Sequence, residues 1–167
     1  MATPQGAQLS QIIHRKMEEL KKLCEKVDEA AASRAPAGRW SPKEILSHVC
    51  GPDGVGFFPS IQTILDKETP RLDIKPEDPF FTEKRRRMTM KELLAEFDKE
   101  YEHLAQVAKG LSEDQLKRKA HIPMLKDSPI GEYPTLAVWI SAIGEHHLGM
   151  HIDHMKEILQ GLGVAIT

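Results

Sequence analysis

Residues 136–160 read LAVWISAIGEHHLGMHIDHMKEILQ, and this stretch decides the fold class. Its apolar residues recur at intervals of three and four, which is the period of an amphipathic helix and not of a strand. Thr135 offers a capping hydroxyl immediately before the stretch, and Gly161 follows its last residue. The pattern predicts one continuous helix from Leu136 to Gln160.

Three further amphipathic segments precede it, at residues 9–33, 41–65 and 89–110. The second is expected to kink at residues 51–54 (GPDG), because proline removes a backbone donor and disrupts the helix. No strand alternation of convincing length occurs. Four helices of this pattern predict an all-α protein, a four-helix bundle that forms a single domain over residues 1–167.

Local signals indicate where the helices begin and what separates them. The capping-box pattern Ser/Thr-x-x-Glu/Gln occurs at residues 41–44, 89–92 and 112–115, and the last of these predicts a short extra helix. Long connections rich in proline are expected over residues 69–87 and 121–134. The second connection is either a loop or contains short extended pieces.

The composition bounds the kind of protein. The chain has 167 residues, 40% of them apolar, and a formal net charge of −2, which is typical of a soluble globular domain and not of a dedicated nucleic-acid binder. No apolar run approaches the roughly 20 residues that span a bilayer, and the first residues lack a signal-peptide pattern. The two cysteines, Cys24 and Cys50, are expected to pack in the interior. We expect a cytoplasmic protein that acts on a small molecule, with neither nucleic acid nor a membrane as partner.

Four of the eight histidines fall within residues 146–154. On a helical wheel at about 100° per residue, His147, His151 and His154 fall on the apolar stripe, whereas His146 points away from it. A buried imidazole needs a partner, because an unpaired buried polar group costs on the order of 1–3 kcal/mol. A divalent metal ion such as zinc, nickel or iron would satisfy several such rings at once.

The ligand set depends on which histidines can converge on one ion. His147 and His151 have the favourable i, i+4 spacing, and His48, on the apolar side of a facing helix, is the natural third ligand. Spacing alone leaves the pair His151 and His154 open. The cluster could instead form a hydrogen-bonded polar network or a pH-sensitive interface. The paired Glu-x-x-His motifs of di-iron bundles and the HExxH motif of zincins do not occur.

Other residues that could carry chemistry have simpler interpretations. The basic run at residues 84–87 (KRRR) is expected to be a solvated charge cluster; the alternative is that it attracts a carboxylate or phosphate. Trp40 and Trp139 are expected to pack against the bundle.

Two motifs resemble those of a known family. Residues 40–48, WSPKEILSH, are similar to the Trp-Ser-x-x-Glu-x-x-x-His motif that opens the second helix of the DinB-like, YfiT-type four-helix-bundle superfamily. Residues 145–154, EHHLGMHIDH, resemble that family's last helix, and residues 93–116 resemble its third helix with its Leu-Ser-x-x-Gln-Leu continuation. The family often has Gln where this chain has His154.

The resemblance implies a divalent ion held by His48, His147 and His151, often in a homodimer. Characterised relatives include transferases and isomerases that use low-molecular-weight thiols such as glutathione, mycothiol or bacillithiol. The family commonly has an acidic residue three positions after the first ligand. This chain has Gly51 there, and Asp53 is the nearest acidic residue that follows.

Two functional interpretations follow. In the first, the chain is a metal-dependent enzyme, a thiol S-transferase or a hydrolase, in which the ion lowers the pKa of a thiol or water. In the second, it is a non-catalytic metal- or ligand-binding bundle. The candidates for a catalytic acid or base are His154, Asp53 and Glu145, which the sequence does not rank.

Overall fold

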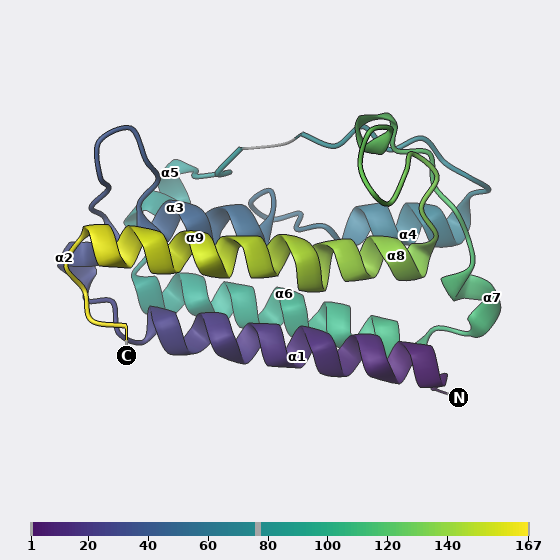
Figure 1. Ribbon diagram of the computed structural model, residues 1–167, viewed down its shortest axis with the longest axis horizontal. Helices are drawn as coiled ribbons and strands as arrows, with labels where there is room; N and C mark the ends of the chain where they lie inside the picture. The colour runs from purple at the N-terminus through teal and green to yellow at the C-terminus, as the bar shows by residue number, and fades with distance from the viewer. Residues whose placement is uncertain (1, 76–77, 167) are drawn as a thin grey trace.

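The computed structural model describes residues 2–75 and 78–166, and within them the fold is helical (Figure 1). Over these two ranges, β-structure is limited to two isolated bridges in the connecting segments. The predicted all-α class is therefore confirmed. No helix in the described part of the chain combines the length and the apolar character needed to cross a membrane.

Four helical rows lie side by side. They are α1 (Pro4–Cys24); α3 (Pro42–Cys50) followed by α4 (Phe58–Asp66); α6 (Met90–Gly110); and α8 (Leu136–Ser141), the π-helical turn η2 (Ala142–His147) and α9 (Leu148–Gly161). The connections contain α2 (Glu29–Ala32), α5 (Glu83–Arg87), α7 (Glu113–Leu116) and the 3-10 turn η1 (Pro123–Leu125). Helix α1 packs on α6, α6 on α3, α3 on α9, and α9 on α1, which closes the bundle.

The order of the rows forces one connection to travel the length of the bundle. In Figure 1, α1 and α8–α9 run from right to left, whereas α3–α4 and α6 run from left to right. Because the neighbours α3 and α6 point the same way, the chain between α4 and α5 must return along the outside. We call the described residues 67–75 and 78–82 the crossover segment.

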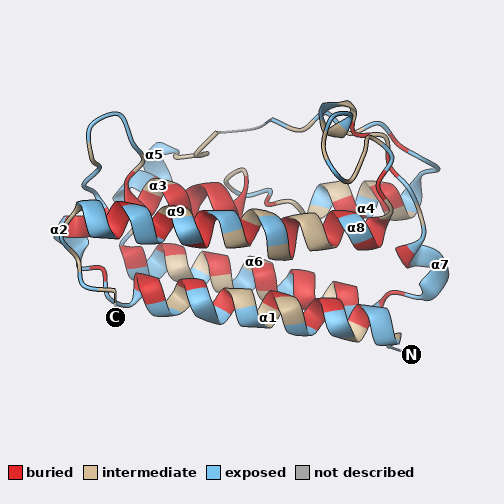
Figure 2. Cartoon of the chain, in the orientation of Figure 1, coloured by how far each residue is buried: buried red, intermediate tan, exposed pale blue. Residues whose placement is uncertain are grey.

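The core lies between the four rows, where the helices present their apolar faces (Figure 2). Fully buried side chains come from every row and include Leu20, Leu46, Phe97 and Ile140. Burial of apolar surface is worth about 25 cal/mol per Å², so this core is a source of stability that needs no metal.

The helices begin where the capping boxes predict. At α3, the Ser41 hydroxyl accepts a hydrogen bond from the Glu44 N–H, and the Glu44 carboxylate accepts one from the Ser41 N–H, both at 3.2 Å. The same reciprocal pair forms at Thr89 before α6 and at Ser112 before α7. The first of these boxes fixes the start of α3 and places His48 in its last turn.

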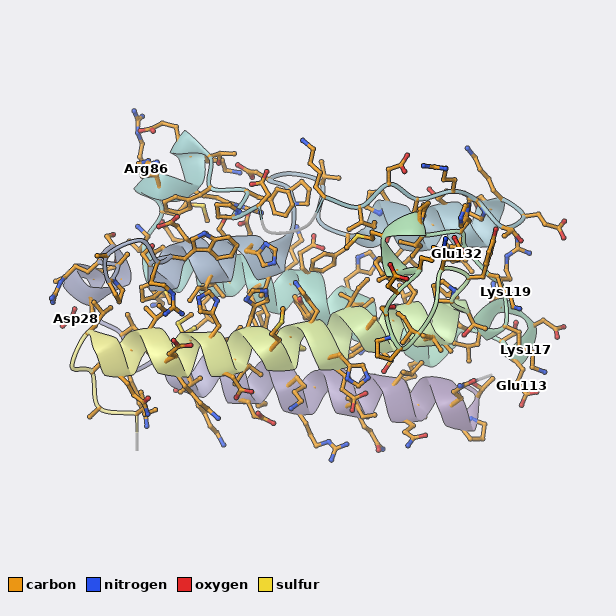
Figure 3. All side chains as sticks on the ribbon, turned by 45° about the horizontal axis from the view of Figure 1, so that its top comes forward. Asp28, Arg86, Glu113, Lys117, Lys119 and Glu132 are labelled. Atoms are coloured by element: carbon orange, nitrogen blue, oxygen red, sulfur yellow. The ribbon has the colours of Figure 1, made fainter. Side chains whose placement is uncertain are left out.

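The first predicted helix, over residues 9–33, is interrupted. Helix α1 ends at Cys24 and the chain leaves the helix over residues 25–28. Asp28 is the physical reason, because its carboxylate accepts a hydrogen bond from the Ala31 N–H at 2.8 Å and caps α2. A short acidic side chain that binds the backbone locally competes with a continuing helix. Asp28 lies at one end of the bundle in Figure 3.

The last helix also departs from the predicted geometry. Residues 136–160 do not form one regular α-helix, because η2 interrupts it between α8 and α9. A π turn contains more residues than an α turn, so side chains beyond it are rotated relative to a wheel drawn at about 100° per residue. His147 is the last residue of this turn.

Gly144 allows η2 to lie close to α1. A Cβ atom at this position would lie 2.6 Å from Cγ1 of Ile13, which is closer than real carbon contacts permit. The π turn that ends at His147 therefore contacts α1 at a position that has no side chain.

We predict that Gly144→Ala lowers the free energy of unfolding by about 1–3 kcal/mol, because the added methyl group overpacks the contact with Ile13. Gly149→Ala is the matched control, since the nearest atom to its Cβ would be Lys16 Nζ at 3.7 Å. That control should be neutral or gain up to about 1 kcal/mol from helix propensity. Urea unfolding compares the two variants, and equal stabilities would contradict the close approach.

Candidate metal centre

Three histidines from two rows of the bundle meet at one point. His48 lies in the last turn of α3, His147 ends η2, and His151 follows one turn later in α9. One ring nitrogen from each lies within 4.8 Å of the corresponding atoms of the other two. The closest pair, Nε2 of His48 and Nε2 of His147, is 3.0 Å apart. The structure thus brings together the three side chains that the sequence suggests as ligands.

The spacing of these nitrogens suits one ion. Two nitrogens that each lie about 2.0–2.1 Å from a tetrahedral zinc ion are roughly 3.3 Å from one another. The observed separations, 3.0 Å for the closest pair and no more than 4.8 Å for any pair, bracket that value.

The Nε2 atom of His151 is available to a ligand. This atom is buried, and no described group forms a hydrogen bond with it. An orphaned buried polar atom costs on the order of 1–3 kcal/mol, whereas a metal ion would use its lone pair. The donor set therefore fits a divalent ion.

A backbone carbonyl sets the tautomer of His48. Its Nδ1 lies 2.5 Å from the carbonyl oxygen of Asp78, so Nδ1 carries the proton and donates it. The lone pair of Nε2 is then available on the side of His147. Histidines that bind metals usually donate their second N–H in this way, which orients the ring. Asp78 belongs to the crossover segment.

Burial favours the neutral form of His147 and His151. It lowers the pKa of His147 from 6.5 to about 4, with a further contribution from His48. Burial also lowers the pKa of His151 to about 3, and the neighbouring imidazoles add to this shift. Neutral imidazole is the form that binds metals, because protonation occupies the lone pair.

Aromatic rings enclose the cluster. The Trp40 indole is stacked nearly parallel to His151, with ring centroids 6.3 Å apart, and its centroid is 5.1 Å from that of His48. The Phe80 ring is parallel to His48 at 5.9 Å. These rings flank His48 and His151 and limit the space in which the two imidazoles can rotate.

Of the three candidate acids or bases, the structure brings only His154 to the cluster. Its Nδ1 lies 3.3 Å from Nδ1 of His151. Asp53 instead accepts a hydrogen bond from the Thr82 hydroxyl at 2.6 Å and lies 3.5 Å from Lys84 Nζ. The hydrogen bond from Thr82 and the nearby cations hold the pKa of Asp53 below its usual value.

Glu145 belongs to a different surface of the molecule. Its carboxylate accepts a hydrogen bond from the Ser141 hydroxyl at 2.9 Å. Both residues line a groove between α1 and α8 that also includes Leu9 and Ile12. Glu145 is therefore not placed among the histidines.

The basic run at residues 84–87 is only partly a solvated cluster, which corrects the prediction for it. Lys84, Arg86 and Arg87 are exposed, and Figure 3 shows Arg86 projecting outward from α5. Arg85, in contrast, is only 2% exposed. Sequence periodicity did not distinguish it from its neighbours.

Arg85 ties the crossover segment to α3. It donates to the carbonyl oxygens of Gly51 at 2.6 Å, Ser47 at 3.1 Å and Phe80 at 3.2 Å. Helix α3 ends at the Gly51 cap, so carbonyls in its last turn lack helical partners and need other donors. Ser47 directly precedes His48, and the Phe80 ring is stacked on the His48 imidazole. By binding the carbonyls of both residues, the Arg85 guanidinium supports His48 from two sides.

A cavity of about 640 Å³ adjoins the cluster. His48 and His147 line it, together with residues from the α3–α4 junction, the crossover segment, η1 and α8–η2. A molecule in this cavity would reach the cluster between these two imidazoles.

Both cysteines are free and buried, as predicted. Burial raises the pKa of Cys24 to about 12 and that of Cys50 well above its usual value. Neither is suited to act as a thiolate nucleophile at neutral pH.

A protein family and a solved structure match this chain. The family model of the DinB superfamily matches residues 12–155. The structure superimposes on YfiT from Bacillus subtilis with a TM-score of 0.76 and 19% sequence identity, over 99% of this chain and 91% of that one. That protein is described as a probable metal-dependent hydrolase with an unusual four-helix bundle topology, and the likeness is one of fold. No curated protein matches the sequence.

We predict that Arg85→Met lowers the free energy of unfolding by about 3–5 kcal/mol, because it removes one partner of a buried charged network. The carbonyls of Ser47 and Gly51 would lose the guanidinium as a donor, and the Glu96 carboxylate, 3.4 Å from Arg85 Nε, would lose its ion-pair partner. Arg86→Met is the exposed control and should change stability by less than about 0.5 kcal/mol. Similar losses for the two variants in urea unfolding would refute the supporting role of Arg85.

The metal-free protein is predicted to lose stability as the pH falls from about 7.5 to about 5. His147 and His151 titrate near 6.5 in the unfolded chain, but only near 4 and 3 in the folded one. Below pH 6.5 the unfolded chain binds more protons than the folded chain, because its two imidazoles have the higher pKa values. The free energy of unfolding therefore falls as the pH drops from 6.5 toward the folded pKa values of about 4 and about 3. The expected loss at pH 5 is about 2–4 kcal/mol.

Urea unfolding of chelator-treated protein at the two pH values measures this loss. His146→Gln, which removes a side chain that is 72% exposed, should retain it. The double variant His147→Gln/His151→Gln should lose most of the pH dependence. A wild-type stability that does not change with pH would contradict the burial of neutral imidazoles.

Proposed function

The chain belongs to the DinB superfamily, and on that premise we propose that it is a divalent-metal-dependent enzyme acting on a small molecule. The proposed ligands are His48, His147 and His151, and the ion is zinc, nickel or iron. The observation that carries this proposal is the convergence of three imidazole nitrogens, one of them buried without a partner, beside a cavity of about 640 Å³.

The cavity favours an enzyme over a bundle in which the metal only stabilises the fold. Structural zinc sites are closed by four protein ligands, whereas catalytic sites have three and leave a position open. The cluster of described residues contains three histidines, and two of them, His48 and His147, line the cavity. The apolar core between the rows also gives the bundle a source of stability that is independent of the ion.

The chain's own residues would hold and orient the ligands. His48 presents Nε2 because its Nδ1 donates to the Asp78 carbonyl, and Trp40 and Phe80 restrict the rings. His154, whose Nδ1 faces Nδ1 of His151, is proposed to position that ligand from behind. A divalent ion held there would supply a Lewis acid and lower the pKa of a water or thiol at neutral pH.

Hydrolysis is the first reaction to test, because YfiT is described as a probable metal-dependent hydrolase. Transfer to or from a low-molecular-weight thiol is the second candidate, and it rests on the resemblance of residues 40–48 and 145–154 to the family motifs. Both reactions require a nucleophile activated at neutral pH. A homodimer and a cytoplasmic location remain predictions, and analytical ultracentrifugation tests the first of them.

We predict that replacing His48, His147 or His151 with Ala lowers metal content at least about tenfold, because each supplies one of only three protein ligands. His146→Ala, which removes a side chain that is 72% exposed on the same helical row, is the matched control and should retain the ion. Elemental analysis of protein purified without added metal measures the content, and circular dichroism verifies that each variant is folded.

Full stoichiometric metal in all three alanine variants would show that the ligand assignment is wrong. Hydrolysis of neutral esters and amides, and thiol transfer with glutathione, are then compared between metal-loaded and chelator-treated protein. Equal rates in the two preparations would exclude a metal-dependent reaction of that class.

A further inference from the structure

We infer that the cavity beside His48 and His147 binds a small uncharged molecule with an apolar, ring-sized body and one polar group directed at these imidazoles. This inference rests on the proposed function, because it names the substrate class of the same site. The size of the cavity, about 640 Å³, lies within the range of roughly 300–1,000 Å³ that holds small organic molecules.

The walls are formed mainly by carbon atoms. Aromatic and aliphatic side chains from the α3–α4 junction, the crossover segment, η1 and α8–η2 contribute to them; they include Phe57, Ile74, Phe80, Leu125, Trp139 and Ile143. Apolar surface of this kind is favourable for apolar ligand groups, since both surfaces leave water together.

Two polar side-chain atoms of lining residues, Ser60 Oγ and Trp139 Nε1, already have partners. Ser60 Oγ donates to the Phe57 carbonyl at 2.8 Å and accepts from Trp139 Nε1 at 3.1 Å. A strongly polar or charged ligand body would therefore lose its hydration here without an adequate replacement. The wall selects against such ligands.

The outer part of the cavity is also suited to an uncharged ligand. Met124 and Met150, which are 50% and 52% exposed, line it with flexible thioether side chains. Among the residues that the structure describes, the charged ones in the lining are one acid and one base, Asp73 and Lys75, both exposed, and Asp73 is 3.2 Å from Arg71. Opposite charges at the rim do not favour an ion of either sign.

The inner end of the cavity is polar at two imidazoles. His48 and His147 are the lining residues that belong to the proposed metal site, and Nδ1 of His48 is already used in the hydrogen bond to the Asp78 carbonyl, whereas its Nε2 lies 3.0 Å from Nε2 of His147. A ligand with one polar end gains most when that end faces these imidazoles and its body lies against Trp139 and Ile143.

Two fluorescent probes that share a ring system test this inference. N-phenyl-1-naphthylamine is uncharged, whereas 8-anilinonaphthalene-1-sulfonate has nearly the same rings with a permanent negative charge. We expect the uncharged probe to bind with one-to-one stoichiometry and at least about tenfold more tightly than the anion, in both chelator-treated and zinc-loaded protein.

Variants locate the binding. Met124→Lys/Met150→Lys places two charges at exposed positions of the lining and should weaken binding of the uncharged probe at least about fivefold. Val138→Lys, at a 37% exposed apolar position of α8 that does not line this cavity, is the matched control and should leave affinity unchanged.

The outcomes separate this inference from the proposed function. An uncharged probe that binds no better than the anion, or that is insensitive to the double variant, overturns the inference even if the metal content follows the histidines. Tight binding of the uncharged probe that is lost in the double variant supports the inference, and it does so even if elemental analysis finds no metal and the proposed function fails.

Discussion

The gathering of three imidazoles, two of them buried, at one point in an apolar bundle is the constraint on which the rest of the structure depends. His48 and His151 are only 6% and 3% exposed, and each ring nitrogen that leaves water requires a partner. The Asp78 carbonyl satisfies one nitrogen of His48, and His154 faces one of His151, but Nε2 of His151 has no described partner. Apolar residues would have filled the same space without this penalty. A ligand that uses the lone pairs is the economical explanation.

The topology of the bundle supplies the support that this constraint requires. Because the neighbours α3 and α6 are parallel, the chain must return along the outside, and the crossover segment ends beside α3 (Figure 1). There it contributes the carbonyl of Asp78 and the ring of Phe80 to His48. Arg85, immediately after this segment, binds the carbonyls at the end of α3 and that of Phe80. The long connection is thus part of the candidate site.

The helix starts and the meeting of His48 with His147 and His151 could be predicted from the sequence, whereas the tertiary contacts that support these histidines could not. The capping boxes at Ser41 and Thr89 determine helix starts through bonds between near neighbours, so the pattern alone indicated them. The π turn was missed because it accompanies a contact between Gly144 and the distant Ile13. Arg85 was missed because its burial depends on the crossover segment and the end of α3. For the same reason, the sequence did not rank the acid–base candidates.

The central claim is that imidazoles from α3 and α9, together with the end of η2, hold one divalent ion. X-ray absorption at the K edge of the metal that copurifies with the protein tests this most directly, because it reports the ligand atoms themselves. The account predicts a first shell of nitrogen or oxygen at about 2.0–2.1 Å for zinc, with the outer-shell scattering of about three imidazole rings. A first shell of sulfur at about 2.3 Å, or of oxygen without imidazole scattering, would contradict it.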